Sequence, residues 1–153
     1  SSPPVVYVLY DDLDYLPRWI FKIGFFPVIK ASVDNYGRGS VALLVINKKS
    51  LSEALKHAHI LFLATHGTEE GILSRDGLIK PEDVKNMQRN YNLRYVYLSG
   101  CKGGNQKALW EEAFNPAEVF AYTRMTATLE HIAWFWFSAP KLIRGDKLIF
   151  TGS

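Results

Sequence analysis

The segments HILFLATHG (residues 59–67) and RYVYLSGCKGG (residues 94–104) decide the fold of this chain. Each begins as a short apolar run and stops at a residue that can do chemistry, His66 in the first and Cys101 in the second. Short, nearly continuous apolar runs are typical of parallel strands that helices cover on both faces. Parallel strands present their carboxyl ends at one edge of a sheet, where ligands bind. We therefore expect His66 and Cys101 to meet at that edge, although they are far apart in sequence.

Further apolar runs complete a pattern in which strands alternate with helices. The expected strands are residues 5–10, 41–47, 59–65, 94–99 and 118–122, with a last edge strand at 147–150. The expected helices are residues 13–29, 51–58, a helix begun by Pro81, 106–114 and 126–143. Gly24 and Pro27 are expected to close the first helix, and Ser50 with Glu53 to form a capping box for the second.

This order of elements predicts an α/β fold. We expect three layers, α/β/α, with a mostly parallel, doubly wound sheet and a small β-hairpin insertion. Asp76 and Gly77 predict the tight turn of that hairpin, between residues 72–73 and 78–79.

Length and composition are those of one globular domain spanning residues 1–153. The chain is 48% hydrophobic and 22% charged, which is typical of a protein that buries a core without disulfides. One cysteine cannot form an internal disulfide and favours a reducing compartment, so we expect a cytoplasmic protein. The net charge of +3 is not clustered, and no uncharged run could span a bilayer, so neither nucleic acid nor a membrane is an expected partner. Ser1 to Pro4 resemble a cloning remnant or the trimmed start of a larger protein.

The motifs resemble those of the caspase-like cysteine peptidases, the superfamily of caspases, metacaspases, gingipains, separase and CHAT domains. The matching residues are Thr65, His66 and Gly67 after one strand, and the run from Ser99 to Gly103 after the next. The caspase signature shares with this chain a small residue before the cysteine and a glycine two residues after it. The hairpin between the motifs is similar to that of CHAT-type members. The resemblance implies a caspase-like sheet and a cysteine endopeptidase.

Cysteine chemistry gives a role to each of three residues. A free thiol with a pKa of about 8.5 is only slightly ionised at neutral pH, so Cys101 needs His66 as base or as imidazolium partner. Attack by Cys101 on a peptide or protein substrate would give a thioester acyl-enzyme, with His66 protonating the leaving amine. Gly67 lacks a side chain, so its N–H and that of Cys101 can form an oxyanion hole. One cysteine with scattered histidines matches no metal-site spacing, so neither a metal nor a cofactor is expected.

Asp11 and Asp12 follow the first expected strand and are candidates for binding substrate. That strand is expected beside the His66 strand, so a carboxylate could pair with an arginine or lysine that precedes the scissile bond. The resemblance supports this interpretation, because several caspase-like families, though not the caspases, use acidic pockets. Arg124, at the end of the fifth expected strand, supports the opposite preference, for an acidic residue. Capping of the following helix is the alternative role of the two aspartates.

A catalytically idle caspase-like module that acts as a protein-interaction platform is the alternative function. The aromatic run from Trp134 to Phe137 supports it if that helix is partly exposed, because an exposed apolar face marks a neighbouring domain or a partner protein. A helix packed on the sheet is the simpler interpretation of the run. A phosphorelay receiver domain is excluded, because His66 stands where such a domain needs its phosphoacceptor aspartate. His57, His59 and His131 are interpreted as structural or surface groups.

Overall fold

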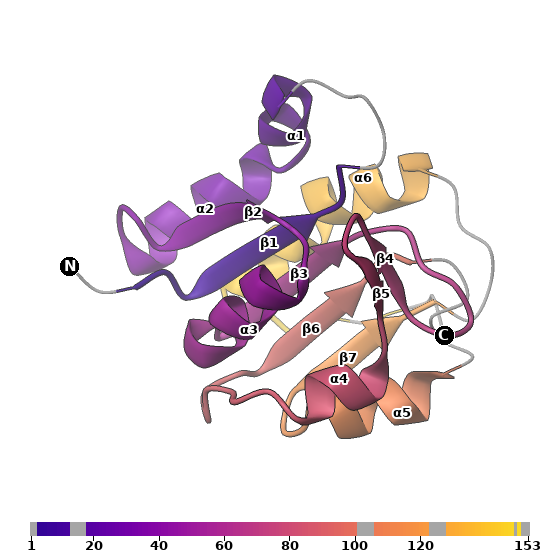
Figure 1. The fold of residues 1–153 in the computed structure, drawn as a ribbon. Coiled ribbons are helices and arrows are strands. Elements are labelled where there is room, and N and C mark those ends of the chain that lie inside the picture. Colours follow the sequence, from indigo (N-terminus) through magenta and orange to yellow (C-terminus); the bar gives the residue numbers. More distant parts are fainter. Residues whose placement is uncertain (1–2, 13–17, 101–105, 123–127, 149, 151–153) are drawn as a thin grey trace.

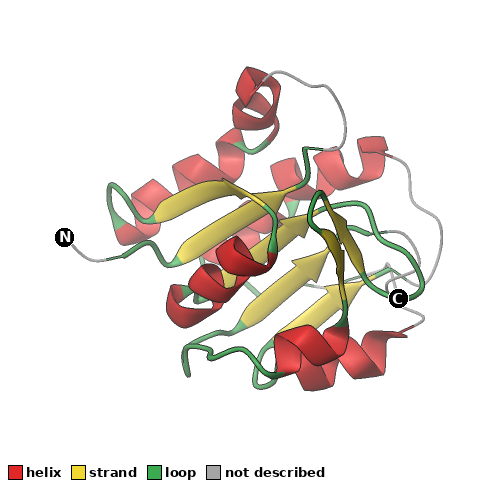
Figure 2. Ribbon diagram, in the orientation of Figure 1, coloured by secondary structure: helices red, strands yellow, loops and turns green. Residues whose placement is uncertain are grey.

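The computed structural model describes residues 3–12, 18–100, 106–122, 128–148 and 150, and its fold is mixed α/β (Figures 1 and 2). The strands are β1 Val6–Tyr10, β2 Val41–Val45, β3 Ile60–Ala64, β4 Ile72–Ser74, β5 Gly77–Ile79, β6 Tyr95–Leu98 and β7 Glu118–Ala121. The helices are α1 Arg18–Gly24, α2 Phe26–Tyr36, α3 Lys48–His57, α4 Pro81–Lys85, α5 Lys107–Ala113, α6 Thr128–Phe137 and α7 Ala139–Ile143.

The main sheet has the strand order β2-β1-β3-β6-β7, and every pairing within it is parallel. The five strands predicted for this sheet are all present, each within two residues of its predicted bounds. The predicted α/β architecture, a parallel sheet flanked by helices, is therefore confirmed. The prediction of an edge strand at residues 147–150 is wrong. The described residues of this segment lie outside strands, and Leu148 and Phe150 pack against the core.

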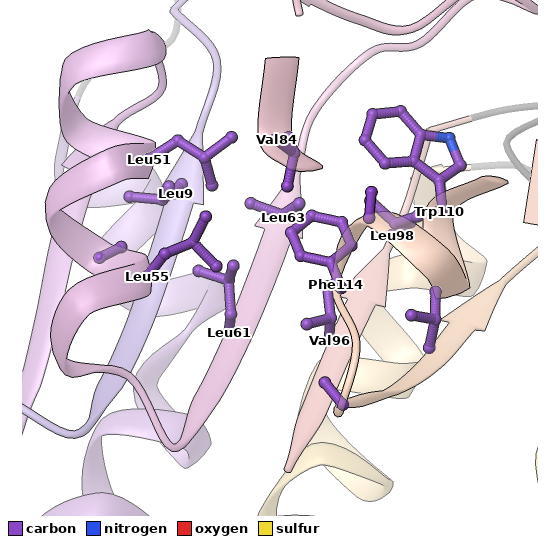
Figure 3. Packing of buried hydrophobic residues seen from close by; sticks show 14 of the residues in the cluster. Leu9, Leu51, Leu55, Leu61, Leu63, Val84, Val96, Leu98, Trp110 and Phe114 are labelled. Atoms are coloured by element: carbon purple, nitrogen blue, oxygen red, sulfur yellow. The ribbon is translucent and has the colours of Figure 1, made fainter. Parts of the chain in front are cut away.

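Alternate side chains along the strands point to opposite faces of the sheet and build two cores. One core lies between the sheet and helices α3, α4 and α5 (Figure 3). Its central side chains include Leu9, Leu51, Leu55, Leu61, Leu63, Val84, Val96, Leu98, Trp110 and Phe114. The other core lies between the sheet and helices α2, α6 and α7 and includes Val8, Val28, Phe62, Tyr97, Phe120, Phe135 and Leu142. Because both faces are covered, the strands are apolar except for Glu118 at the start of β7, and they show no alternation in sequence.

The order of the strands reverses between β1 and β3. The first strand neighbours the His66 strand, and the His66 strand neighbours the strand that leads to Cys101, as the sequence predicts. The chain passes from β1 outward to β2 and then crosses to β3 on the other side of β1, so the order reverses there. Ligands of doubly wound sheets bind at this reversal. The reversal lies between the strands that Asp11 and His66 follow, because β3 is the first strand after the crossing.

The N-terminal helix prediction is corrected by the structure. Gly24 ends α1, but Pro27 opens a second helix and does not close the first. A proline is tolerated in the first helical turn because the N–H that it lacks would have no partner there. Helix α2 then continues to Tyr36, through residues that the sequence predicts as a turn.

Two further helix ends differ from prediction. Helix α3 begins earlier than expected because Asn47 is its N-cap: the Asn47 side chain accepts the Ser50 N–H at 2.7 Å, and Ser50 Oγ accepts the Asn47 N–H at 2.9 Å. Ser50 therefore completes the capping box and Glu53 is not part of it. The predicted C-terminal helix is divided into α6 and α7 at Ser138, where Pro140 again occupies a first turn.

The predicted hairpin is present and packs against the segment that carries His66. Strands β4 and β5 pair antiparallel, and Gly77 adopts a φ of 123° that closes the turn. The Leu73 N–H donates to the His66 carbonyl at 3.0 Å. A Cβ atom at Gly71 would lie 2.3 Å from the Ile79 carbonyl oxygen, so the base of the hairpin closes only around a glycine.

Replacing Gly71 with alanine is expected to open the base of the hairpin, because the atom it meets is backbone and cannot swing aside. Urea denaturation should show a loss of about 1–3 kcal/mol in the free energy of unfolding. The Leu73 amide, which bonds to His66, should exchange faster with solvent. Gly24→Ala is the matched control, because its Cβ would meet nothing within 4 Å. Equal stability of the two variants would contradict the close approach at Gly71.

Candidate functional site

His66 and Asp11 come together at the carboxyl ends of β3 and β1. The register pairs Tyr10 with Ala64, so the residues that follow these strands emerge side by side. Asp11 Oδ2 lies 2.7 Å from His66 Nδ1 and accepts the His66 backbone N–H at 2.5 Å. The Asp11 side chain is 6% exposed and the His66 side chain 57% exposed. An ionised carboxylate only accepts hydrogen bonds, so Asp11 favours a proton on Nδ1, and the neutral imidazole then has its lone pair on Nε2.

Ser99 ties the end of β6 to the end of β3. Its Oγ accepts the Thr65 N–H at 3.0 Å and donates to the Leu63 carbonyl at 3.0 Å, and its own N–H donates to that carbonyl at 3.0 Å. Both Ser99 and Thr65 are buried. The Thr65 hydroxyl makes no hydrogen bond with any residue that the structure describes. The bonds of Ser99 extend the pairing of β3 and β6 past the last ladder position, toward His66.

Glycines allow the two strand ends to touch. A Cβ atom at Gly100 would lie 3.3 Å from both Cα and N of Gly67. Such a contact is tight for a Cβ atom, so the absence of a side chain at Gly100 favours this close approach to the Gly67 backbone. Gly67 follows His66 and Gly100 precedes Cys101, and the contact therefore joins the two motifs that the sequence analysis singled out.

Asp12 has a partner different from that of Asp11. Its Oδ2 lies 3.0 Å from Nε of Arg75, and its carbonyl accepts a hydrogen bond from Arg75 Nη2 at 3.3 Å. Arg75 occupies the turn of the β4–β5 hairpin, whose tip lies by the end of β1 (Figure 1). The two aspartates that the sequence analysis grouped in one acidic pocket are thus separated: Asp11 contacts the histidine, and Asp12 contacts an arginine.

The structure brings together part of the predicted site. Asp11, His66 and Gly67 meet at the carboxyl ends of β1 and β3, and Gly100 brings the end of β6 to them. Cys101 and Arg124 lie outside the described residues. The Cys101 nucleophile, its pairing with His66, its N–H in the oxyanion hole and the opposite charge preference of Arg124 stay predictions.

A cavity of about 370 Å³ lies between α4 and α5. Glu70, four residues after His66, and Gln106 also line it. Lys85 and Glu112 form an ion pair at 2.6 Å in its wall, and this pairing lowers the pKa of the Glu112 carboxyl. The wall of the cavity is therefore charged, and neither Asp11 nor His66 lines it.

The aromatic run on α6 is half packed and half exposed. Trp134 and Phe135 are buried, and Trp134 stacks on Tyr97 at 3.7 Å between ring centroids. Trp136 and Phe137 are 41% and 72% exposed. His131 also has a place in this packing, with Nδ1 2.9 Å from the Tyr97 hydroxyl. Burial raises the pKa of Tyr97, so that hydroxyl stays neutral.

Three roles were not anticipated from the sequence: Asp11 as the partner of His66, Ser99 as the link between strand ends, and Arg75 as the partner of Asp12. For Asp11 a signal existed, because an acid that ends one strand and a histidine that ends the next must lie close in a parallel sheet. For Arg75 there was none, since local sequence predicts a turn but not what its tip contacts.

No helix in the described part of the chain is both long and apolar enough to cross a membrane. Among the same residues, no group of three His, Cys, Asp or Glu side chains could hold a metal ion. A scan with protein-family models and a search of curated proteins each found no match to this chain. The parallel sheet order is common to doubly wound folds of many functions, so the argument for function rests on the residues at its edge.

Ser99→Ala is expected to destabilise the protein by about 1–3 kcal/mol, because it leaves the buried Thr65 N–H without its acceptor. Urea denaturation measures the change. Ser74→Ala is the matched control: Ser74 Oγ also bonds to a carbonyl, that of Gly77 at 2.7 Å, but in an exposed turn. We expect the control to change stability by less than about 0.5 kcal/mol. If the two substitutions lower the free energy of unfolding by the same amount, Ser99 does not hold the strand ends together.

Proposed function

We propose that this protein is a caspase-like cysteine endopeptidase in which Cys101 is the nucleophile and His66 the general base. The observation that carries the proposal is the buried Asp11 carboxylate on Nδ1 of an exposed histidine. This pairing orients the imidazole with its basic nitrogen away from Asp11, the arrangement that a nucleophile and base require from a third group. A histidine with a merely structural role would not need to be held in this way at an exposed sheet edge.

Backbone geometry supports the position of the nucleophile. A Cβ atom on Gly100 would lie 3.3 Å from the Gly67 backbone, and Cys101 is the next residue along the chain. The proposal therefore assigns the nucleophile to the residue that follows this end of β6. In the first step the Cys101 thiol would give its proton to His66, its sulfur would form a bond to the carbonyl carbon of the substrate, and the π electrons of the carbonyl would move to its oxygen. The Gly67 N–H and the Cys101 N–H would stabilise the negative charge that develops on the carbonyl oxygen.

Collapse of this intermediate breaks the C–N bond, and His66 transfers its proton to the departing amine. The product of the step is a thioester between Cys101 and the acyl part of the substrate. Water then attacks the thioester carbon, His66 takes a proton from that water, and the thiol is released with a carboxylic acid. Asp11 touches neither substrate nor thiol, so it is a positioning residue that holds His66 in one tautomer.

Thiol labelling tests the catalytic pair directly, because the chain contains one cysteine. We expect iodoacetamide to label folded wild type at pH 7 at least about tenfold faster than the His66→Ala variant, since the thiolate is the reactive form. His57→Ala is the matched control, because the His57 ring pairs with Glu53 on the same helix, α3, and not with the residues of the candidate site. A folded wild-type protein whose Cys101 does not react would exclude the peptidase.

Asp11→Asn is expected to lower kcat on fluorogenic peptides about 100-fold or more while KM changes little, because the wrong tautomer of His66 becomes available. The readout is kcat and KM measured separately, together with the free energy of unfolding. Asp34→Asn, at an exposed ion pair with Lys30 on α2, is the control and should leave both constants unchanged. A fall in stability with normal kcat would show that Asp11 acts on the fold alone.

An interaction platform is the second candidate, and one observation favours it. Leu129, Ile132, Trp136 and Phe137 are exposed large apolar residues of α6. Such a face is what a partner protein or neighbouring domain would cover. The labelling experiment distinguishes the two functions. In a catalytically idle module, His66→Ala is expected to leave the rate of Cys101 labelling unchanged.

A further inference from the structure

We propose that the outer edge of β2 binds an extended segment of a partner protein, which has apolar residues along the strand and acidic residues at both ends. The segment would pair with β2 as an additional strand of the main sheet. This surface is separate from the candidate site, and its use does not depend on catalysis.

The two edges of the main sheet differ in how far they are covered. Strands β2 and β7 form these edges. In β7, Val119, Phe120 and Ala121 are buried, and Glu118 is the one exposed residue. In β2, every residue from Val41 to Val45 is half-buried, which holds for no other strand in the described part of this sheet. The edge that β2 forms is therefore the open one (Figure 1).

Hydrogen bonds at the two ends of β2 show which of its residues face β1. The Ser40 carbonyl accepts the Val6 N–H at 2.9 Å, and the Ile46 N–H donates to the Tyr10 carbonyl at 2.8 Å. The N–H and C=O groups of successive residues in a strand point to opposite sides, so the even-numbered residues from 40 to 46 direct theirs to β1. The odd-numbered residues direct theirs away from it.

Val41, Leu43 and Val45 therefore present their backbone groups at the open edge. A contact with α3 supports this direction, because the Val45 carbonyl accepts a hydrogen bond from Ser50 Oγ at 2.8 Å. Among the described residues, no other group forms a hydrogen bond to this side of β2. A row of unpaired N–H and C=O groups is the template on which an extended segment adds as a strand.

The side chains of β2 favour an apolar partner. The strand reads VALLV, without the charged residues or prolines that natural edge strands use to prevent pairing. Val41 and Leu43 pack partly on one face of the sheet, and Ala42 and Leu44 pack partly on the other. An added strand with apolar side chains on both faces would extend both cores at this edge.

Basic residues at both ends of the edge select the charge of the partner. Arg38 lies three residues before β2, Lys48 and Lys49 lie shortly after it, and all three are exposed. Lys48 is partly matched by Asp83, at 3.6 Å. Two copies of this chain paired antiparallel about Leu43 would bring the Arg38 end of each copy to the lysine end of the other, and opposed like charges are destabilising. Acidic residues at both ends of a partner segment would instead be attracted to this edge.

Peptides test the strand pairing and the charge separately. The probe is a fluorescein-labelled peptide, Glu-Glu-Val-Ile-Val-Leu-Val-Glu-Glu, whose binding to the full chain is followed by fluorescence anisotropy. One comparison peptide has lysine in place of each glutamate. The other has methyl groups on the backbone nitrogens of two adjacent central residues, which blocks both of its edges. We expect the probe to bind at least about tenfold more tightly than either, because one lacks the opposite charge and the other lacks the strand hydrogen bonds.

Charge reversal tests the contribution of the basic ends. Arg38→Glu combined with Lys49→Glu is expected to weaken binding of the probe about tenfold and to strengthen binding of the lysine peptide, because each attraction becomes a repulsion. The matched control is Lys107→Glu combined with Lys147→Glu, which changes the net charge equally on and near segments that pack on β7. At about 0.15 M salt the control should bind both peptides as wild type does.

Hydrogen exchange locates the probe without any substitution. Saturating probe should slow exchange of the Leu43 and Val45 amides, which face the open edge, at least about tenfold. The Ala42 and Leu44 amides, which face β1, should change much less.

Three outcomes would overturn the inference. The first is equal binding of all three peptides, or binding of none. The second is loss of binding in Phe137→Ser with normal binding in the β2-edge variant, which would place the probe on the exposed apolar face of α6. The third is a wild-type dimer in sedimentation that protects the Leu43 amide without any peptide, which would show that a second copy occupies the edge.

Discussion

The parallel pairing of β3 with β1 on one side and β6 on the other is the constraint on which the rest of the structure depends. Parallel strands in register end at the same level, so whatever residues follow them are brought to one edge. Asp11, His66 and Gly100 are such residues, from three distant parts of the chain. The apolar cores on both faces hold the three strands in this register, because a shift of one residue would exchange the buried faces of a strand.

Polar contacts then fix the positions of the residues that the strand register brings to the sheet edge. Asp11 contacts both the backbone and the ring of His66, and Ser99 joins the segments after β3 and β6. Asp11 and Ser99 are buried, and an unpaired buried polar group is costly, so each of their contacts is strongly preferred over its absence. Gly100 contributes through the absence of a side chain, because its backbone can then approach that of Gly67.

The β4–β5 hairpin is a separate two-stranded sheet that the parallel sheet does not require. It inserts between β3 and β6 in sequence, packs against the His66 segment and carries Arg75 to Asp12 at the end of β1. The hairpin thereby contacts both the segment after β3 and the segment after β1. A change in the packing of this hairpin would therefore affect both the His66 segment and Asp12.

Much of this protein was determined by sequence alone. The five strands of the main sheet, the hairpin and the layered α/β architecture follow from apolar runs and turn residues, because burial on both faces and a tight turn each demand a local residue pattern. The sequence likewise predicts that the segments after β3 and β6 approach each other, since the edge of a parallel sheet allows little else. The end of α2 at Tyr36 and the cap at Asn47 were not predicted, because several residues nearby satisfy the same local preferences and packing selects among them.

Only the tertiary structure decided which polar groups pair. Two adjacent aspartates are equivalent in sequence, yet Asp11 turns to His66 and Asp12 to Arg75. The reason is that successive residues at the end of a strand point in different directions, one toward the neighbouring strand and one toward the hairpin that crosses it. Their partners are set by strand order and hairpin docking, which are properties of the whole fold and are not written in any local stretch of the chain.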